Sequence, residues 1–199
     1  MTGTPTATVP PEPVITFFGV TNGDDHLVSP NPDPAEDGTP IYLRPAYNFS
    51  LVVEARPGGT GAKLGNSTYN PANPTSLPDL QVEVSNDLGN ASPAVCDGGV
   101  PAVTPFDFSA AEAAAINDLS CRFKDGVGAY KGRDKSEPCT RFLPSDDAHF
   151  VDPTSTIQYC GLVSDAISFP SGDGTVVAVR VRDVDGNLSA ISKIIIRVP

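Results

Sequence analysis

The chain has 199 residues, including 18 Gly and 21 Pro, and a formal net charge of −11 at pH 7. This length suits one elaborated domain, and so much Gly and Pro excludes a mainly helical fold. The negative charge would repel nucleic acid and anionic lipid surfaces, so we expect neither as a partner.

The N-terminal residues MTGTPTATVPPEP alternate Thr with Pro and cannot build a core, which predicts a flexible tether over residues 1–13. We expect a single domain to fill residues 14–199. It begins with PVITFFGV, a β-branched and aromatic run typical of a strand, and simple alternation places Val14, Thr16 and Phe18 on one face. No apolar run is long enough to span a bilayer, so we expect no membrane insertion.

Two further strands are predicted from alternating aliphatic residues. The stretch DLQVEVSND places Leu80, Val82 and Val84 on one face. The segment PIYLRPAYNFSLVVEARPG predicts a half-buried strand with one apolar face. Its inward residues are Tyr47, Phe49, Leu51 and Val53, and its outward residues are Asn48, Ser50, Val52 and Glu54.

Residues 57–155 are expected to form a long irregular insertion, because much of this region lacks a period and is rich in turn residues. One short helix is predicted within it, over FSAAEAAAINDLS, residues 108–120. Ser109 and Glu112 form a capping box, and the alanines that follow favour a helix.

The four cysteines, Cys96, Cys121, Cys139 and Cys160, contain no C-x-x-C pair that would indicate zinc or haem. We therefore expect two disulfides, an oxidising compartment, and an extracellular or cell-surface location. Three pairings are open. Cys96–Cys121 with Cys139–Cys160 is favoured, because neighbour closure would hold the two parts of the insertion that lack strand periodicity.

The C-terminal third carries the clearest strand signals. STIQYCGLV predicts one strand, and TVVAVRVRDVDGNLSAISKIIIRV predicts a closing hairpin. Its two strands share six core positions, which are Val177, Val179, Val181, Ile194, Ile196 and Val198.

This ending, together with the opening PEPVITFFGV, resembles bacterial immunoglobulin-like and fibronectin III-like surface modules. In such modules the last hairpin often reads as alternating valines, then Asp-x-x-Gly-Asn-x-Ser, then a second aliphatic strand. The resemblance implies an all-β fold, an immunoglobulin-like β-sandwich, which here would carry long loop insertions, one short inserted helix and two disulfides. It also implies a place at the cell surface or outside the cell.

The acidic sequence Asp183-Val184-Asp185-Gly186-Asn187 lies between the two hairpin strands. Asp183, Asp185 and Asn187 offer oxygen ligands at alternate positions, a pattern that suits calcium. Asp-Gly is equally a common hairpin-turn dipeptide, and no bidentate Glu follows it. The turn is the favoured interpretation, with a calcium site as the alternative.

No G-x-S-x-G elbow, H-E-x-x-H helix or phosphate-binding glycine loop is present, so we predict no enzyme and no required cofactor. The sequence favours a structural or adhesive module whose partners are other protein domains or copies of itself. Two alternatives stay open. One is a self-assembling filament or coat subunit that donates a strand, VITFF or KIIIRV, and the other is a calcium- or carbohydrate-binding accessory module.

Overall fold

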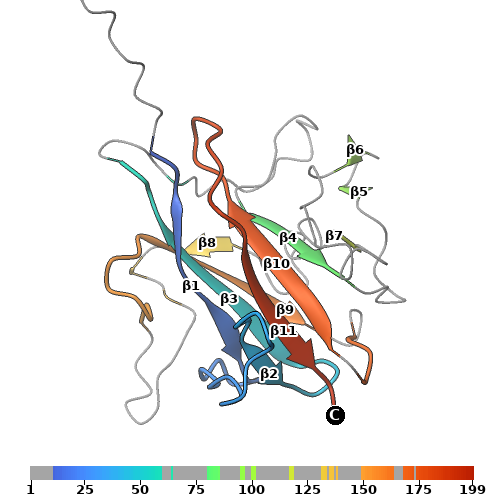
Figure 1. Cartoon of the computed structure of the whole chain (residues 1–199). Coiled ribbons are helices and arrows are strands. Elements are labelled where there is room, and N and C mark those ends of the chain that lie inside the picture. The colour runs from blue at the N-terminus through green and yellow to red at the C-terminus, as the bar shows by residue number, and fades with distance from the viewer. Residues whose placement is uncertain are drawn as a thin grey trace, which may run out of the picture.

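The described part of this computed structural model consists of β-strands and loops (Figure 1). The structure describes residues 11–59, 64, 80–85, 95–96, 100–101, 117–118, 131–133, 135–136, 138, 149–163, 168–172 and 174–199. The strands are β1 (Val14–Thr21), β2 (Ile41–Leu43), β3 (Phe49–Arg56), β4 (Leu80–Val84), β5 (Val95–Cys96), β6 (Val100–Pro101), β7 (Asn117–Asp118), β8 (Lys131–Arg133), β9 (Ile157–Val163), β10 (Thr175–Val181) and β11 (Ser192–Arg197).

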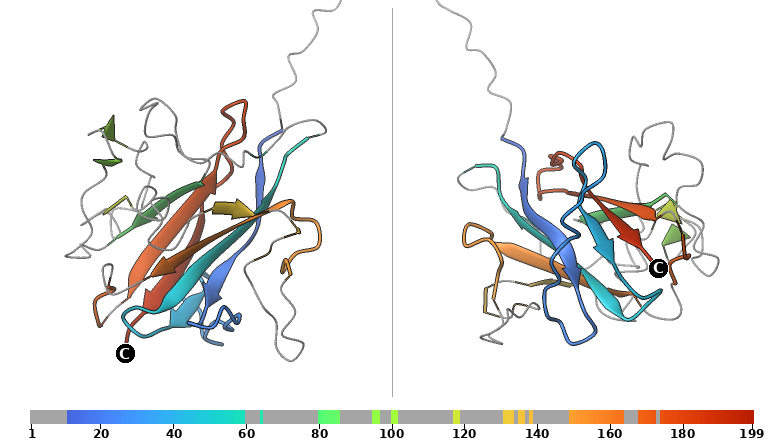
Figure 2. Two further views of the ribbon diagram at one scale, coloured as in Figure 1. Left: turned by 180° about the vertical axis from the view of Figure 1, so that it is seen from behind. Right: turned by 60° about the horizontal axis from the view of Figure 1, so that its bottom comes forward.

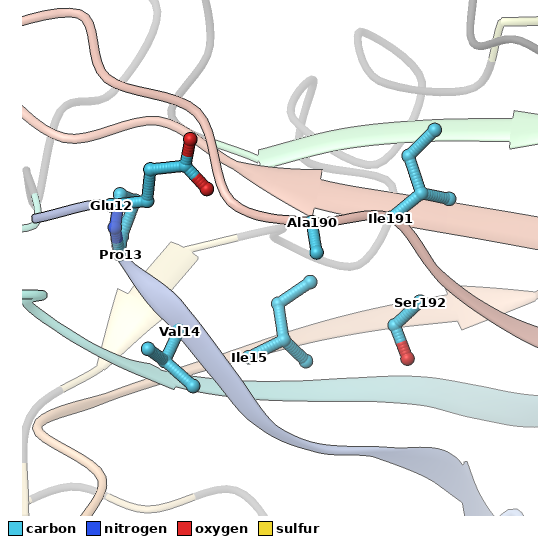
Figure 3. Close-up of a pocket in the computed structure, with 7 residues that line it drawn as sticks. All are labelled: Glu12, Pro13, Val14, Ile15, Ala190, Ile191 and Ser192. Carbon is cyan, nitrogen blue, oxygen red and sulfur yellow. The ribbon is translucent and has the colours of Figure 1, made fainter.

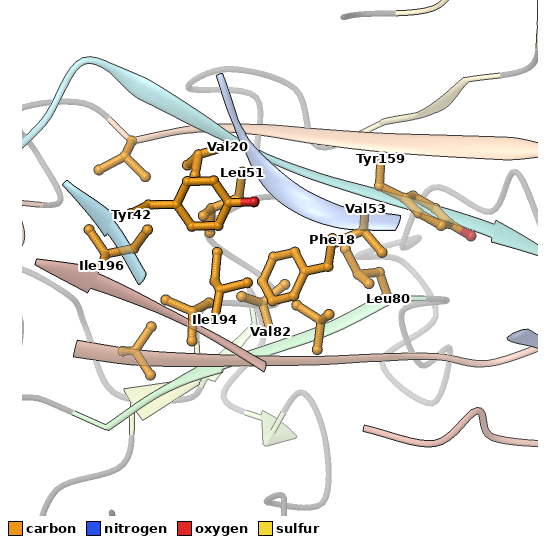
Figure 4. Packing of buried hydrophobic residues seen from close by; sticks show 14 of the residues in the cluster. Phe18, Val20, Tyr42, Leu51, Val53, Leu80, Val82, Tyr159, Ile194 and Ile196 are labelled. Atoms are coloured by element: carbon orange, nitrogen blue, oxygen red, sulfur yellow. The ribbon is translucent and has the colours of Figure 1, made fainter. Parts of the chain in front are cut away.

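Two sheets contribute side chains to one hydrophobic core. The first has the order β1-β3-β9-β8 and the second β2-β11-β10-β4-β7, while β5 and β6 pair separately. All pairs are antiparallel except β11 with β2. Figure 4 shows Phe18 from the first sheet close to Val82 and Ile194 from the second, and Val53 and Tyr159 of the first sheet belong to the same cluster. The all-β prediction is confirmed at this level.

The C-terminal hairpin forms as predicted. In it β10 pairs with β11 from Thr175↔Ile196 to Val179↔Ser192. All six predicted core positions are at most 6% exposed. Alternation therefore identified the buried face of both strands, because every second side chain of a strand points the same way.

The prediction of a half-buried β3 is wrong on its outward face. Ser50, Val52 and Glu54 are buried, as are Phe49, Leu51 and Val53, whereas Tyr47 lies before the strand and is exposed. β3 lies between β1 and β9, and residues 151–155 bind Glu54 on the side away from the core. When both faces of a strand are covered, successive side chains are all buried and burial no longer alternates along the strand.

The prediction of a helix over residues 108–120 is wrong at its C-terminal end. Asn117 and Asp118 form β7, which pairs with Val84 and Glu83 at the edge of the second sheet. Strand pairing there outweighs the local helix preference of the alanine-rich sequence. The rest of the predicted helix lies outside the described residues, as do residues 1–10 of the predicted tether.

β1 is more irregular than simple alternation predicts. The register against β3 shifts between Ile15 and Phe17, so Thr16 is the extra residue of a β-bulge. The predicted shared face of Val14, Thr16 and Phe18 is therefore interrupted. Phe18 lies in the core. The Thr16 hydroxyl instead forms a hydrogen bond with the Ser155 hydroxyl, on the side of the first sheet away from the core.

The first and last strands place their outer ends far apart. β1 begins at one end of the domain and β11 delivers the C-terminal residue at the other, and both strands run in the same general direction (Figures 1 and 2).

Candidate functional site

The acidic sequence between β10 and β11 forms a five-residue turn. The buried Asp183 carboxylate accepts backbone N–H groups from Asp185 at 3.0 Å and Asn187 at 2.8 Å, and the Asn187 side-chain amide at 2.8 Å. Gly186 has a φ of 90°, which favours glycine. These contacts occupy both Asp183 oxygens within the turn itself.

A second turn of the same design closes the end of β1. In Asn22–His26 and in Asp183–Asn187, the side-chain oxygen of the first residue accepts the N–H groups of the third and fifth residues. In both, the first N–H donates to the fifth carbonyl and the fourth N–H to the first carbonyl. The fourth residue has a positive φ in each, 62° at Asp25. Because Asn replaces Asp in the first turn, the design needs an oxygen acceptor rather than a charge.

Two of the three calcium ligands predicted from sequence, Asp183 and Asn187, are therefore already hydrogen-bonded to each other. Asp185 is exposed and contributes only its backbone N–H to the turn. Among the described residues, no group of three or more His, Cys, Asp or Glu side chains could hold a metal ion. A calcium ion would have to draw oxygens away from the turn, and this alternative stays a prediction.

Of the four predicted disulfide cysteines, Cys160 has its side chain described. It lies in β9, opposite Val52 of β3 and Lys131 of β8. Cys96 lies in β5, with only its backbone described, while Cys121 and Cys139 lie outside the described residues. The pairing stays a prediction.

A fully buried carboxylate, Glu54, organises the outer side of the first sheet. Its Oε1 accepts the Val151 N–H at 2.6 Å and the Gln158 amide at 2.7 Å. Its Oε2 accepts the Asp152 N–H at 2.8 Å and the Ser155 hydroxyl at 3.0 Å. Four donors satisfy two oxygens, the arrangement an ionised carboxylate requires, since it has acceptors only.

This cluster also ties three strands to one loop. The Ser155 hydroxyl donates to Glu54 and lies 2.5 Å from the Thr16 hydroxyl in the β1 bulge. Gln158 adds β9, so the carboxylate of β3 joins both neighbouring strands and residues 151–155. Both oxygens of this carboxylate are therefore used by hydrogen bonds inside the fold. Sequence analysis missed it, although a single acidic residue inside FSLVVEAR was a usable signal.

The Asp152 carboxylate is hydrogen-bonded within a neighbouring turn. The side chain and the backbone N–H of Thr154 both donate to it at 2.7 Å, and these bonds lower the pKa of Asp152 below 3.8. Because the folded-state pKa lies below the unfolded value, the stabilisation is present above about pH 4 and is lost as pH falls through the folded value.

One described pocket, of about 320 Å³, lies where β1 starts, beside the segment that enters β11 (Figure 3). Its lining is Glu12, Pro13, Val14, Ile15, Ala190, Ile191 and Ser192. Glu12 and Ser192 lie at opposite ends of it in Figure 3, so the carboxylate does not approach the hydroxyl. Among these lining residues, no carboxylate therefore lies beside the Ser192 hydroxyl to act as its base.

Within the described residues, no helix has the length and hydropathy needed to cross a bilayer. Comparison of the chain with models of known protein families, with curated proteins and with solved structures gave no match.

Proposed function

We propose that this chain is a non-enzymatic structural or adhesive module of a cell-surface or extracellular protein, with an immunoglobulin-like β-sandwich fold. The observation that carries the proposal is the arrangement of its terminal strands: β1 begins at one end of the domain and β11 ends at the other. This arrangement lets a domain be inserted in line between neighbours without folding the chain back. Other domains are its partners in that role.

The internal chemistry of the domain supports a structural role. The polar groups that sequence or geometry singles out are used inside the fold: Asp183 closes a turn and Glu54 joins three strands. A binding or catalytic carboxylate needs free acceptor capacity on a cleft, whereas these two carboxylates stabilise loops.

The filament alternative finds less support, because both candidate donor strands are already built into the domain. β11, which contains all of KIIIRV except Val198, pairs with β10 on one side and with β2 on the other over Ile195–Arg197. β1, which contains VITFF, is interrupted by a bulge, and its last residue, Thr21, pairs with Leu27, just after the turn that closes the strand. Bulges and local pairing of this kind protect edge strands from joining other copies.

Two disulfides complete the proposed module, with Cys96 bridged to Cys121 and Cys139 to Cys160. A non-reducing tryptic map tests the pairing, because no Lys or Arg lies between residues 64 and 121. Neighbour pairing would leave peptide 64–122 unlinked and join 136–141 to 142–180. Either other pairing would join all three peptides, and that product would contradict our assignment.

The location is tested on cells that make the full-length protein. Antibodies against this chain should label intact cells or the medium, and added protease should remove the surface label. Label found only after the cells are lysed would overturn the proposal. Electron microscopy of purified chain should show dispersed particles, and ordered fibres would favour strand donation.

The calcium alternative is tested by calorimetry. Heat of binding at millimolar calcium that disappears in Asp185→Ala would establish the site, and no heat would remove it. The same titration with sugars tests the carbohydrate alternative.

A further inference from the structure

We infer that Asn48 carries an N-linked glycan, which makes it a covalent modification site at one end of the first sheet. Asn48-Phe49-Ser50 matches the acceptor sequence Asn-x-Ser/Thr, in which x is not Pro. The inference rests on the proposed function, since an exported chain is the kind that meets the enzymes attaching such glycans. It adds what covers part of the module's surface.

The same acceptor sequence begins at three other asparagines of the chain, Asn66, Asn90 and Asn187. Asn66 and Asn90 lie outside the described residues. Asn187 lies in the turn between β10 and β11, so its surroundings can be compared directly with those of Asn48. The comparison asks whether the fold itself already accounts for the Asn and the Ser of each acceptor sequence.

The hairpin turn accounts for both polar residues of the Asn187 sequence. The Asn187 side-chain amide donates to Oδ2 of Asp183 at 2.8 Å. The hydroxyl of the buried Ser189 donates to the Ala190 carbonyl at 2.8 Å and accepts the Val181 N–H at 3.0 Å. A glycan on Asn187 would replace one amide hydrogen and add bulk to a nitrogen held against a buried carboxylate. We therefore expect Asn187 to carry little or no glycan.

The fold makes no such use of the side chains of Asn48 and Ser50. Within the part of the chain that the structure describes, neither the Asn48 amide nor the Ser50 hydroxyl forms a hydrogen bond. Ser50 is nevertheless only 6% exposed. Burying a hydroxyl without a hydrogen bond is unfavourable, so stability does not account for Ser at this position. Glycan transfer does, because the acceptor sequence requires a hydroxyl two residues after the Asn.

The position of Asn48 leaves its amide accessible to a bulky group. Asn48 is exposed and directly precedes β3, at the end of the first sheet where β1 finishes (Figure 1). Its φ of 67° lies in the left-handed region, which Asn adopts more readily than most residues. A Cβ at Gly23, in the turn Asn22–His26, would lie 2.8 Å from the Asn48 side-chain nitrogen. Since position 23 is Gly, no side chain crowds that nitrogen from the turn.

A glycan at this position would also cover exposed apolar side chains. Tyr47, the preceding residue, is 47% exposed, and Leu162, which pairs with Ser50 across β3 and β9, is 37% exposed. N-linked glycans are bulky and solubilising. The glycan would therefore shield these two side chains from contact with other chains.

The test is a glycan map of the full chain taken from the surface or medium of the cells that make it. Glycans are released enzymatically in heavy-oxygen water, which converts each glycosylated Asn to an Asp that carries heavy oxygen. Trypsin then separates the acceptor sequences, because Arg44 and Arg56 each precede Pro and are not cut. The peptides are 1–63 with Asn48, 64–122 with Asn66 and Asn90, and 183–193 with Asn187. A parallel sample without the releasing enzyme corrects for spontaneous deamidation at Asn22-Gly23.

We expect heavy oxygen at Asn48 in most of the chain and at Asn187 in a small fraction at most. Ser50→Ala, which removes only a hydroxyl that forms no hydrogen bond, should abolish the signal at Asn48. Ser50→Thr, which restores the acceptor sequence, should restore it. Urea midpoints equal to that of the deglycosylated parent show that both variants fold, and the parent map decides the question by itself if one does not.

An Asn48 without heavy oxygen, or an Asn187 modified as fully as Asn48, would overturn the inference. The inference and the proposed function fail in different experiments. An unmodified Asn48 on a chain found outside the cell rejects the glycan but leaves an exported module intact. Antibody label confined to the cell interior rejects the exported module whatever the glycan map gives.

Discussion

The sharpest prediction concerns Glu54, whose carboxylate is 0% exposed and accepts four hydrogen bonds. Glu54→Gln keeps the shape of the side chain but replaces one acceptor oxygen with an NH₂ donor. If that NH₂ faces Val151 and Gln158, it meets two donors. If it faces Asp152 and Ser155, the hydroxyl can turn to accept, but the Asp152 N–H loses its partner.

The better orientation therefore loses about two hydrogen bonds to a charged acceptor and leaves the part-buried Asp152 backbone N–H without its acceptor. At about 1.5–3 kcal/mol for each such bond, partly offset by the rotated hydroxyl, we expect a loss of about 3 kcal/mol of unfolding free energy. That is a large part of the ~5–15 kcal/mol typical of a domain.

The assay is urea denaturation followed by circular dichroism, with the native disulfides intact. The midpoint should fall while the slope of free energy against urea stays constant, because the surface exposed on unfolding is unchanged. Glu36→Gln is the matched control: this Glu is exposed, and its loss should change stability by less than about 0.5 kcal/mol. A similarly small change for Glu54→Gln would refute the argument that the carboxylate holds the outer side of the sheet.

Four further outcomes follow from the structure. Asp183→Ala removes three hydrogen bonds from the hairpin turn and should lower stability by about 2–3 kcal/mol in urea denaturation, whereas Asp185→Ala, at an exposed position, should have little effect. Thr21→Val should raise the free energy of unfolding by about 1 kcal/mol, since the described residues give the buried Thr21 hydroxyl no hydrogen-bond partner. Gly58→Ala should lower the thermal midpoint, because no side chain fits against the entering chain. Thermal scans should show stability falling below about pH 4. Asp152→Asn should weaken this acid dependence, since the pKa of Asp152 is lowered in the fold. An unchanged dependence of stability on acid pH in this variant would contradict the contribution of Asp152.

Alternation was informative wherever a strand has one buried face. It identified the core positions of β4 and of the closing hairpin, all of which are buried: Leu80, Val82, Val84, Val177, Val179, Val181, Ile194, Ile196 and Val198. It was wrong at β3, because a loop distant in sequence covers that strand's second face and local polarity carries no trace of the loop. The buried Glu54 was placed outward for the same reason.

Local propensity had a similar limit. The capping box and alanines of residues 108–120 favour a helix, yet Asn117 and Asp118 pair with β4. Strand pairing depends on a partner more than thirty residues away, and helix propensity is a weak preference by comparison. The turn at Asp183, in contrast, was predictable because its contacts lie within five residues.

The sequence by itself determined the strand-rich class, the aliphatic core positions and the polar turn between the last two strands, since each depends on neighbours along the chain. Only the tertiary structure decided that Glu54 is buried, that Thr16 bulges toward Ser155, and that β1 and β11 place the two ends of the domain apart. These features depend on which distant segments meet, and the free energy of those contacts is realised only when the sheets assemble.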